Sequence, residues 1–376
     1  MEKQPIKKQY SEALGLLRFP LAVVVVAVHV FSAVVPGADG VKESSTFFQE
    51  TSNLIFSFLR GQSVPIYFFI SGYVFFLGIT LDRETYKRKL YNRSKTLLIP
   101  FIVWNLLLLL QYVILRMPAF ASFAPSISQI QPSWGLRSVL QCFWDATQCV
   151  FPDSTPGDAG YLYPINGPLW FLRDLMIVVL TTPILYWLLK RVGVWFVLLL
   201  GIAKVMVFFL DWGYSNQLLI AFFFFSWGAY MSVKRKDMMA EFGKYKKTSA
   251  VLYLALATAN MLALHYWPEA CQTLKLASVF VGLLFAYNLA AWLVQHGWCH
   301  QNEFLASASF FIYVSHRLVW IMLLKLVSFV IPPTSGVAIV AIMTMTLVLT
   351  VALLLAVFWL MRRYTPGLLK VVAGRK

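Results

Sequence analysis

Two residues of the first apolar stretch combine residue types and a spacing that could do chemistry. Arg18 and His29 stand eleven positions apart. In an α-helix, eleven steps of about 100° end within roughly 20° of three full turns, so both side chains share one face, about 16.5 Å apart along the axis. A guanidinium can bind a diphosphate through paired hydrogen bonds, and a neutral imidazole can act as a general base. The spacing predicts phosphate binding at one end of this face and proton transfer at the other.

The distance between Arg18 and His29 also suggests the length of a ligand that could contact both. A pantetheine arm has about this reach, which makes acyl-CoA a natural candidate donor. The competing interpretation is a hydrogen-bonded core histidine together with an interfacial arginine. Because neither side chain can face acyl chains without cost, their shared face on a lipid-embedded helix favours a functional role.

The composition requires these residues to be positioned by membrane-spanning helices. The 376-residue chain is 59% hydrophobic and 13% charged, whereas soluble domains carry about 25% charged residues. Its mean hydropathy is +0.70. Apolar runs near the length that crosses the bilayer, about 20 residues, recur throughout. The sequence therefore predicts an all-α polytopic membrane protein of about ten transmembrane helices, near residues 11–36, 52–79, 96–116, 166–189, 194–210, 214–233, 247–267, 271–296, 303–331 and 335–363.

The distribution of basic residues decides what the formal charge of +16 means. A basic chain can indicate nucleic-acid binding, or it can reflect the excess of Lys and Arg on the cytoplasmic side of membrane proteins. Of the 32 basic residues, 22 fall in segments on the side of the N-terminus, whereas 3 fall on the opposite side: Lys42, Arg116 and Arg137. This asymmetry places both termini in the cytoplasm and predicts no nucleic-acid partner.

The chain has one long connection between predicted helices, residues 117–165, on the extracytoplasmic side. It is short for a catalytic domain, so we expect a single transmembrane domain over residues 1–376 with this loop as a possible lid. Its Cys142 and Cys149 could pair in an oxidising compartment. Seven residues of helix would hold their Cα atoms about 10.5 Å apart, so a bridge requires a non-helical loop.

Several segments, in order along the chain, resemble the membrane acyltransferases of acyltransferase family 3. The first is the arginine and histidine pair described above. The others are Val64-Pro65-Ile66-Tyr67-Phe68-Phe69-Ile70-Ser71-Gly72-Tyr73, Tyr86-Lys87-Arg88-Lys89-Leu90 with Arg93, Leu97-Leu98-Ile99-Pro100-Phe101, Pro168-Leu169-Trp170-Phe171-Leu172 and Ser309-Phe310-Phe311-Ile312-Tyr313-Val314-Ser315-His316. Many members of the family carry an acidic residue where this chain has Gly15; the nearest here is Glu12.

The resemblance implies a function. It points to transfer of an acyl group, usually acetyl, from cytosolic acetyl-CoA to a hydroxyl of an extracytoplasmic or lipid-linked glycan, in the cytoplasmic (inner) membrane of a bacterium. His29 would be the catalytic residue, either as a general base on the acceptor hydroxyl or as a transient acyl carrier. The donor phosphates would contact Arg18, with further contacts from Arg88, Arg93 and Lys95.

The remaining candidates would support the site or face the acceptor. His316 lies in the middle of its predicted span, and Ser71 precedes a glycine that could permit close helix approach. Trp170, Arg173 and Asp174 enter their span from the extracytoplasmic side. No metal site is expected. His296, Cys299 and His300 mimic metal-ligand spacing, but no fourth ligand is evident.

One alternative from another functional class stays open at this stage. Arg18 and His29 could line the substrate path of a flippase or exporter of a lipid-linked sugar or polysaccharide, without chemistry. A lipid or amino-acid acyltransferase of the same family would change only the acceptor.

Overall fold

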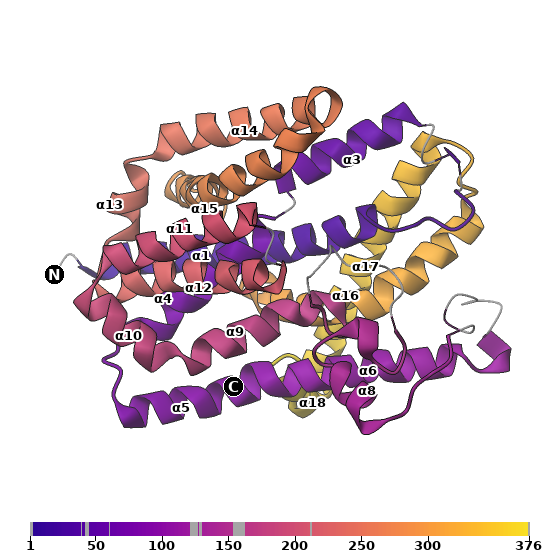
Figure 1. Cartoon of the computed structure of the whole chain (residues 1–376), viewed down its shortest axis with the longest axis horizontal. Coiled ribbons are helices and arrows are strands. Elements are labelled where there is room, and N and C mark those ends of the chain that lie inside the picture. The colour runs from indigo at the N-terminus through magenta and orange to yellow at the C-terminus, as the bar shows by residue number, and fades with distance from the viewer. Residues whose placement is uncertain are drawn as a thin grey trace. The chain divides into compact units, whose positions relative to one another are not determined.

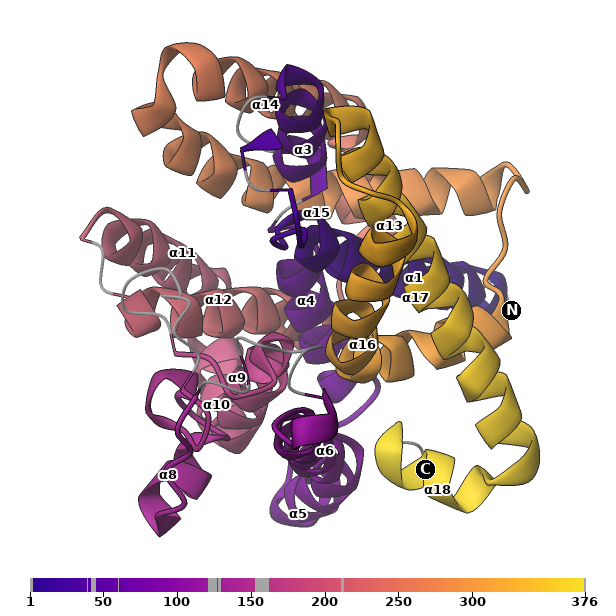
Figure 2. The same cartoon turned by 90° about the vertical axis from the view of Figure 1, so that its right-hand side faces the viewer.

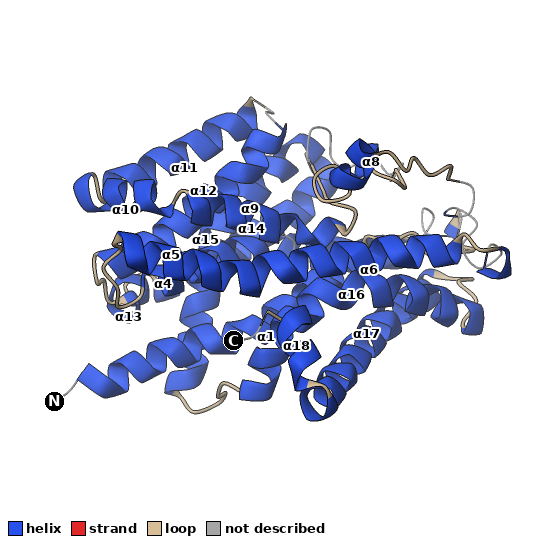
Figure 3. Cartoon of the chain, turned by 90° about the horizontal axis from the view of Figure 1, so that it is seen from below, coloured by secondary structure: helices blue, strands red, loops and turns tan. Residues whose placement is uncertain are grey.

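The computed structural model describes residues 3–38, 40, 41, 45–59, 61–120, 127, 130–152, 162–210 and 213–374. These residues form helices joined by loops, with no strand among them (Figure 1, Figure 3). The predicted all-helical fold is therefore confirmed for this part of the chain. Lys42 and part of the predicted lid, residues 121–126, 128, 129 and 153–161, lie outside the described residues.

All ten predicted stretches contain helix, but they differ in length. Seven described helical segments are long and apolar enough to cross a membrane, and a bent pair, Gly167–Leu180 and Thr182–Arg191, passes the same test when taken as one span. The fifth and sixth stretches hold shorter apolar helices, Val194–Phe209 and Gln217–Val233. The described residues thus form a multi-pass membrane protein with at least seven candidate spans.

The chain divides into two compact units. The first comprises residues 1–70 and 235–357. Its central helix, α1 (Lys3–Phe31), packs against α3 (Thr46–Leu59), α15 (Cys271–Gln295) and α16 (Glu303–Val330). Helix α14 (Lys246–Tyr266) lies beside α15 (Figure 2). This unit also contains α13 (Met238–Gly243), the start of α4 (Ser63–Phe76) and most of α17 (Gly336–Tyr364).

The second predicted span is a broken helix, α3 followed by α4. Gly61, with φ of +89°, adopts a left-handed conformation that a side chain would strain, and Pro65 removes a backbone donor from the first turn of α4. Polar side chains of α14 support the broken end. The Tyr253 hydroxyl donates to the Phe58 carbonyl, and the Asn260 amide donates to the Ser57 hydroxyl over 2.9 Å.

The second unit comprises residues 71–234 and 358–376. Its longest element runs through α5 (Arg83–Arg93), a π-helical turn at Ser94–Leu98 and α6 (Ile99–Leu115). Helices α11 (Val194–Phe209) and α12 (Gly213–Val233) pack as a hairpin, and α12 also contacts α9 (Trp170–Leu180) and α10 (Thr182–Arg191). The C-terminal α18 (Pro366–Val372) packs on α6, where Trp104 Nε1 donates to the Val372 carbonyl over 2.8 Å.

A bend of 63° between α9 and α10 has an identifiable cause. Pro183 has no N–H to donate to the carbonyl of Val179 four residues earlier. The Thr182 hydroxyl takes its place and donates to that carbonyl over 2.7 Å. The Tyr86 hydroxyl donates to the Leu180 carbonyl over 2.8 Å, so the opened turn keeps its acceptors satisfied.

Gly72 allows a close backbone approach within the second unit. A Cβ atom at this position would lie 2.0 Å from the carbonyl oxygen of Phe225 in α12, which cannot move without its helix. We expect Gly72→Ala to destabilise the protein by at least about 1–3 kcal/mol, the usual cost of overpacking. Thermal unfolding in detergent measures the effect. Gly243→Ala is the matched control, because nothing lies within 4 Å of its added Cβ; equal melting temperatures for the two variants would contradict the contact.

Candidate functional site

The first unit brings two of the predicted residues together on its central helix pair. His29 in α1 and His316 in α16 have ring centroids 5.4 Å apart, with the ring planes tilted by 33°. His316 is 1% exposed, whereas His29 is partly exposed. The sequence separates these histidines by 287 positions, so only the packing of α16 on α1 makes them neighbours.

The hydrogen bonding of His316 fixes its protonation pattern. Its Nδ1 lies 2.7 Å from the Tyr313 carbonyl oxygen, which can only accept, so Nδ1 carries the proton. In a neutral imidazole the lone pair then lies on Nε2, which is buried and has no hydrogen-bond partner among the described residues. His316 therefore places a buried acceptor nitrogen on the ring that lies beside His29.

Two tyrosines continue this polar and aromatic face toward Arg18. The Tyr313 ring lies 6.3 Å from the His316 ring and 6.4 Å from the Tyr67 ring. The Tyr67 hydroxyl donates to the backbone carbonyl of Arg18 over 2.7 Å. Arg18 and His29 both lie in helix α1, as the spacing argument requires. The side chains of Tyr67 in α4 and of Tyr313 and His316 in α16 lie between them.

Tyr67 and Tyr313 carry no role in the sequence interpretation above. A signal was present, because each stands inside one of the segments that resemble the acyltransferases, after Ile66 and Ile312. In an apolar run, the sequence pattern does not distinguish a tyrosine that belongs to a site from one that only packs in the core. The contact that distinguishes Tyr67 joins residues 49 positions apart.

Gly15 and Glu12 occupy the stretch of α1 that precedes Arg18. A Cβ atom on Gly15 would lie 1.8 Å from Oε1 of Gln301, so this side chain fills the space that an acidic residue would need. Glu12 instead contacts Nδ1 of His300 over 3.1 Å. The carboxylate nearest in sequence to Arg18 thus faces the loop before α16.

The predicted phosphate-binding residues Arg88, Arg93 and Lys95 lie in the second unit, on α5 and the π-helical turn. Arg93 lies over the Phe75 ring at 5.8 Å, and Lys95 lies over the Tyr91 ring at 4.2 Å. Arg88 is exposed, with Nη2 3.5 Å from the Thr85 hydroxyl. Two of the three cations therefore rest on aromatic rings.

A cavity of about 280 Å³ lies beside the start of α5. It is lined by Leu81, Asp82, Arg83, Tyr86, Pro183 and Tyr186. The Asp82 carboxylate accepts the Thr85 N–H over 2.7 Å and caps α5, and this bond lowers the pKa of Asp82. None of the predicted site residues lines this cavity.

Arg173 and Asp174 form a buried pair at the start of α9. Arg173 Nε and Asp174 Oδ1 are 2.9 Å apart, and the two residues are 4% and 0% exposed. The guanidinium also donates to the Trp144 carbonyl over 2.9 Å and to the Leu162 carbonyl over 3.1 Å, and it lies 4.7 Å from the Trp144 ring. These contacts engage Arg173 in holding the described parts of the 117–165 connection against α9.

Trp170 and Ser71 complete the predicted set. Trp170 is the first residue of α9 and is partly exposed, as is Ser71 in α4. Ser71 immediately precedes the glycine that lies against the Phe225 carbonyl.

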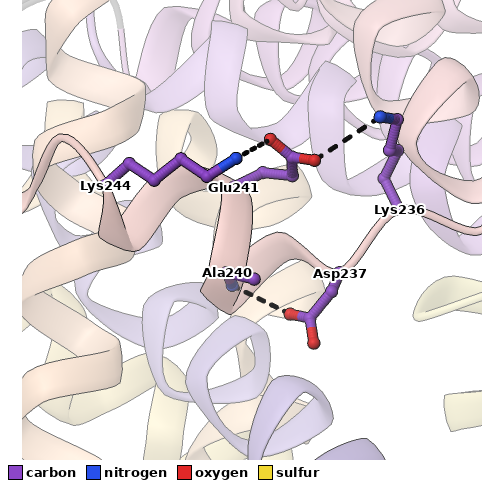
Figure 4. Close-up of polar contacts among 5 residues, drawn as sticks. All are labelled: Lys236, Asp237, Ala240, Glu241 and Lys244. Atoms are coloured by element: carbon purple, nitrogen blue, oxygen red, sulfur yellow. Dashed lines mark hydrogen bonds and ion pairs between the residues drawn. The ribbon is translucent and has the colours of Figure 1, made fainter.

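Two lysines at and near α13 form ion pairs with a glutamate of that helix. Lys236 and Lys244 contact the two oxygens of Glu241 over 3.4 and 3.0 Å (Figure 4). Lys244, and then Lys236, lower the pKa of Glu241 through hydrogen bonds and charge. These exposed pairs are typical of a solvated surface.

Among the described residues, no group of three or more His, Cys, Asp or Glu side chains could hold a metal ion. His296 Nδ1 lies 2.8 Å from the Trp292 carbonyl, and the contact of His300 with Glu12 directs it to α1.

Comparisons with known proteins identify a matching family and a relative. The family described as "Acyltransferase domain" matches residues 11–361. The chain is 25% identical over 322 residues to the succinoglycan biosynthesis protein ExoH of Rhizobium meliloti (strain 1021), an alignment that covers 83% of this chain and 79% of that protein. No solved structure matches the chain.

Proposed function

The chain belongs to the acyltransferase family, and on that premise we propose that it moves an acyl group, acetyl in the first instance, from cytosolic acyl-CoA to a hydroxyl of an extracytoplasmic or lipid-linked glycan. The name of the relative refers to succinoglycan, which supports a glycan as the acceptor. A bacterial inner membrane and ten spans with both termini in the cytoplasm complete the proposal, supported by the 22 basic residues on the side of the N-terminus against 3 opposite.

The observation that carries the proposal is the face of α1 on which His29 meets His316. A neutral imidazole at His29 takes the proton of the acceptor hydroxyl, whose oxygen forms a bond to the thioester carbonyl carbon. When the carbon–sulfur bond breaks, the coenzyme leaves as a thiolate and the imidazolium returns the proton to it. The products are the ester and the free coenzyme, and His29 ends the cycle neutral.

His316 acts in this scheme as a positioning residue. Its Nε2 lone pair can accept an N–H or share the proton that His29 gains, which favours one orientation of the His29 ring. A covalent acyl-His29 intermediate is the variant mechanism, and it would use the same geometry. Trapping labelled acyl groups on the protein in the absence of acceptor distinguishes the two.

Arg18 supplies the other end of the face. About 16.5 Å of helix separates it from His29, which matches an extended pantetheine arm with its thioester at the histidine. We assign the donor diphosphate to Arg18, which can bind it through two parallel hydrogen bonds. Arg88, Arg93 and Lys95 are proposed as further phosphate contacts on the cytoplasmic side.

The acceptor would approach from the extracytoplasmic side. Trp170 offers a ring on which a sugar can stack, and the buried Asp174 holds the Arg173 guanidinium in place beside it. The engagement of Arg173 with the loop carbonyls suggests that Arg173 positions the 117–165 connection, which we propose as a lid over the acceptor. Ser71 would support helix packing.

Deleting the gene tests the proposed function against export without chemistry. We expect the deletion strain to deliver its surface glycan in normal amount but without alkali-labile acyl esters, because acylation modifies a glycan that other proteins carry across. The measurement is glycan yield together with ester content by proton NMR, with complementation by the wild-type gene as control. A strain that exports no glycan, or one that exports fully acylated glycan, would contradict the proposal.

A further inference from the structure

Two cysteines of the long extracytoplasmic connection are buried close together. Cys142 and Cys149 are each 1% exposed. Cys142 Sγ lies 3.5 Å from the Ser138 carbonyl, and Cys149 Sγ lies 3.0 Å from the Phe151 carbonyl. Cys149 is also close enough to the Cys142 thiol to lower its pKa. The two thiols therefore lie near each other inside the folded segment.

The backbone between Cys142 and Cys149 does not form one continuous helix. Helix α8 (Leu136–Gln141) ends one residue before Cys142, and a short 3-10 turn, η3 (Ala146–Gln148), ends one residue before Cys149. Asp145 caps η3 through its contact with the Thr147 N–H over 3.0 Å. Because the chain turns between α8 and η3 and the two pack together, the separation of about 10.5 Å expected for continuous helix does not apply.

Backbone hydrogen bonds close the segment at both ends. The Ser133 N–H donates to the Val150 carbonyl over 3.1 Å, so the chain before Cys142 meets the chain after Cys149. The Ile165 N–H donates to the Cys142 carbonyl over 2.8 Å, and the Ala146 N–H donates to the Tyr163 carbonyl over 2.7 Å. These bonds hold both cysteines in fixed places beside the start of α9.

We propose that Cys142 and Cys149 form an intramolecular disulfide that staples the extracytoplasmic loop. The oxidant is a thiol–disulfide oxidoreductase in its disulfide form. The Cys142 thiolate attacks that disulfide and forms a mixed disulfide; the Cys149 thiolate then attacks the Cys142 sulfur and releases the oxidoreductase as a dithiol. Two electrons and two protons pass from the cysteines to the oxidoreductase, while the segment folds and before its sulfurs are buried.

The staple would stabilise the part of the loop that Arg173 holds. The closed ring contains Trp144, whose carbonyl accepts a hydrogen bond from Arg173. Fixing the turn between Cys142 and Cys149 keeps that carbonyl in reach of the guanidinium. The disulfide and the buried ion pair thus act on the same few residues.

Peptide mapping of the full-length protein tests the bridge directly. Cells are lysed in N-ethylmaleimide and denaturant without reductant, so that no thiol oxidises after lysis. The tryptic peptide Ser138–Arg173 contains both cysteines. We expect it to carry no maleimide and to have a mass lower by two hydrogens, whereas Cys271 and Cys299 carry the label and serve as internal controls. A peptide labelled at both Cys142 and Cys149 would overturn the proposal and leave the proposed acyl transfer untouched.

Thermal unfolding gives a second readout that does not depend on chemical labelling. Dithiothreitol is expected to lower the melting temperature of the wild-type protein and to leave that of the Cys142→Ser/Cys149→Ser variant unchanged, because only the wild type has a crosslink to lose. An equal response of the two proteins would count against the disulfide.

Discussion

Replacing His29 with alanine is expected to lower acyl transfer by about a hundred- to ten-thousand-fold while the donor still binds. The range is the usual contribution of a general base. The His29 ring lies 5.4 Å from the ring of His316, whose Nδ1–H is committed to the Tyr313 carbonyl. The measurement is release of coenzyme thiol by the purified protein, together with its affinity for acetyl-CoA.

The matched variant for His29→Ala is Arg18→Ala, in the same helix three turns away. It removes the guanidinium assigned to the diphosphate, so it should weaken donor binding by about tenfold or more, the effect of a charge-assisted bidentate contact. The two variants are expected to separate turnover from binding. If His29→Ala turned over normally, or if both variants lost binding equally, the assignment of roles along α1 would be wrong.

Arg173→Ala is expected to cost the largest amount of stability of any single substitution considered. It would leave the 0% exposed Asp174 without its guanidinium and would remove two donors from the Trp144 and Leu162 carbonyls. Breaking a buried ion pair from one side costs about 3–5 kcal/mol, because the remaining charge stays desolvated. The measurement is the midpoint of unfolding in detergent.

Arg137→Ala is the control for Arg173→Ala. Arg137 carries the same charge in α8, in the same connection, but it is exposed and should change stability by less than about 0.5 kcal/mol. A stability loss at Arg173 no larger than that at Arg137 would contradict the anchoring contacts. The double variant Arg173→Met/Asp174→Leu should recover part of the loss, because it removes the uncompensated charge.

The helical architecture was predictable because apolar runs of membrane length are a strong signal. All ten predicted stretches contain helix, and seven described helical segments pass the length and hydropathy test for a span on their own. The bend between α9 and α10 was not predicted, since it depends on how Thr182 and Tyr86 satisfy carbonyls next to Pro183. A proline in a sequence shows that a helix can bend and gives no information on which side chains stabilise the opened turn.

The candidate site was only partly predictable, because part of it depends on contacts between helices that are far apart in the sequence. Helical periodicity places Arg18 and His29 on one face, because both lie on one element. The approach of His316 to His29 and the link from Tyr67 to Arg18 depend on tertiary packing, which no local pattern encodes. Arg173 was predicted beside the acceptor from its place in the chain, whereas its contacts with two loop carbonyls give it an anchoring role.

The most direct test of the proposed function is vectorial acyl transfer by the purified protein in sealed vesicles. Acetyl-CoA labelled in its acetyl group is supplied on the face that bears the termini, and the glycan is enclosed on the other. The proposed function predicts alkali-labile label on the glycan in amounts equal to the coenzyme thiol released, and none with His29→Ala. Transfer by His29→Ala at the wild-type rate, or labelling only when donor and glycan share a face, would contradict it.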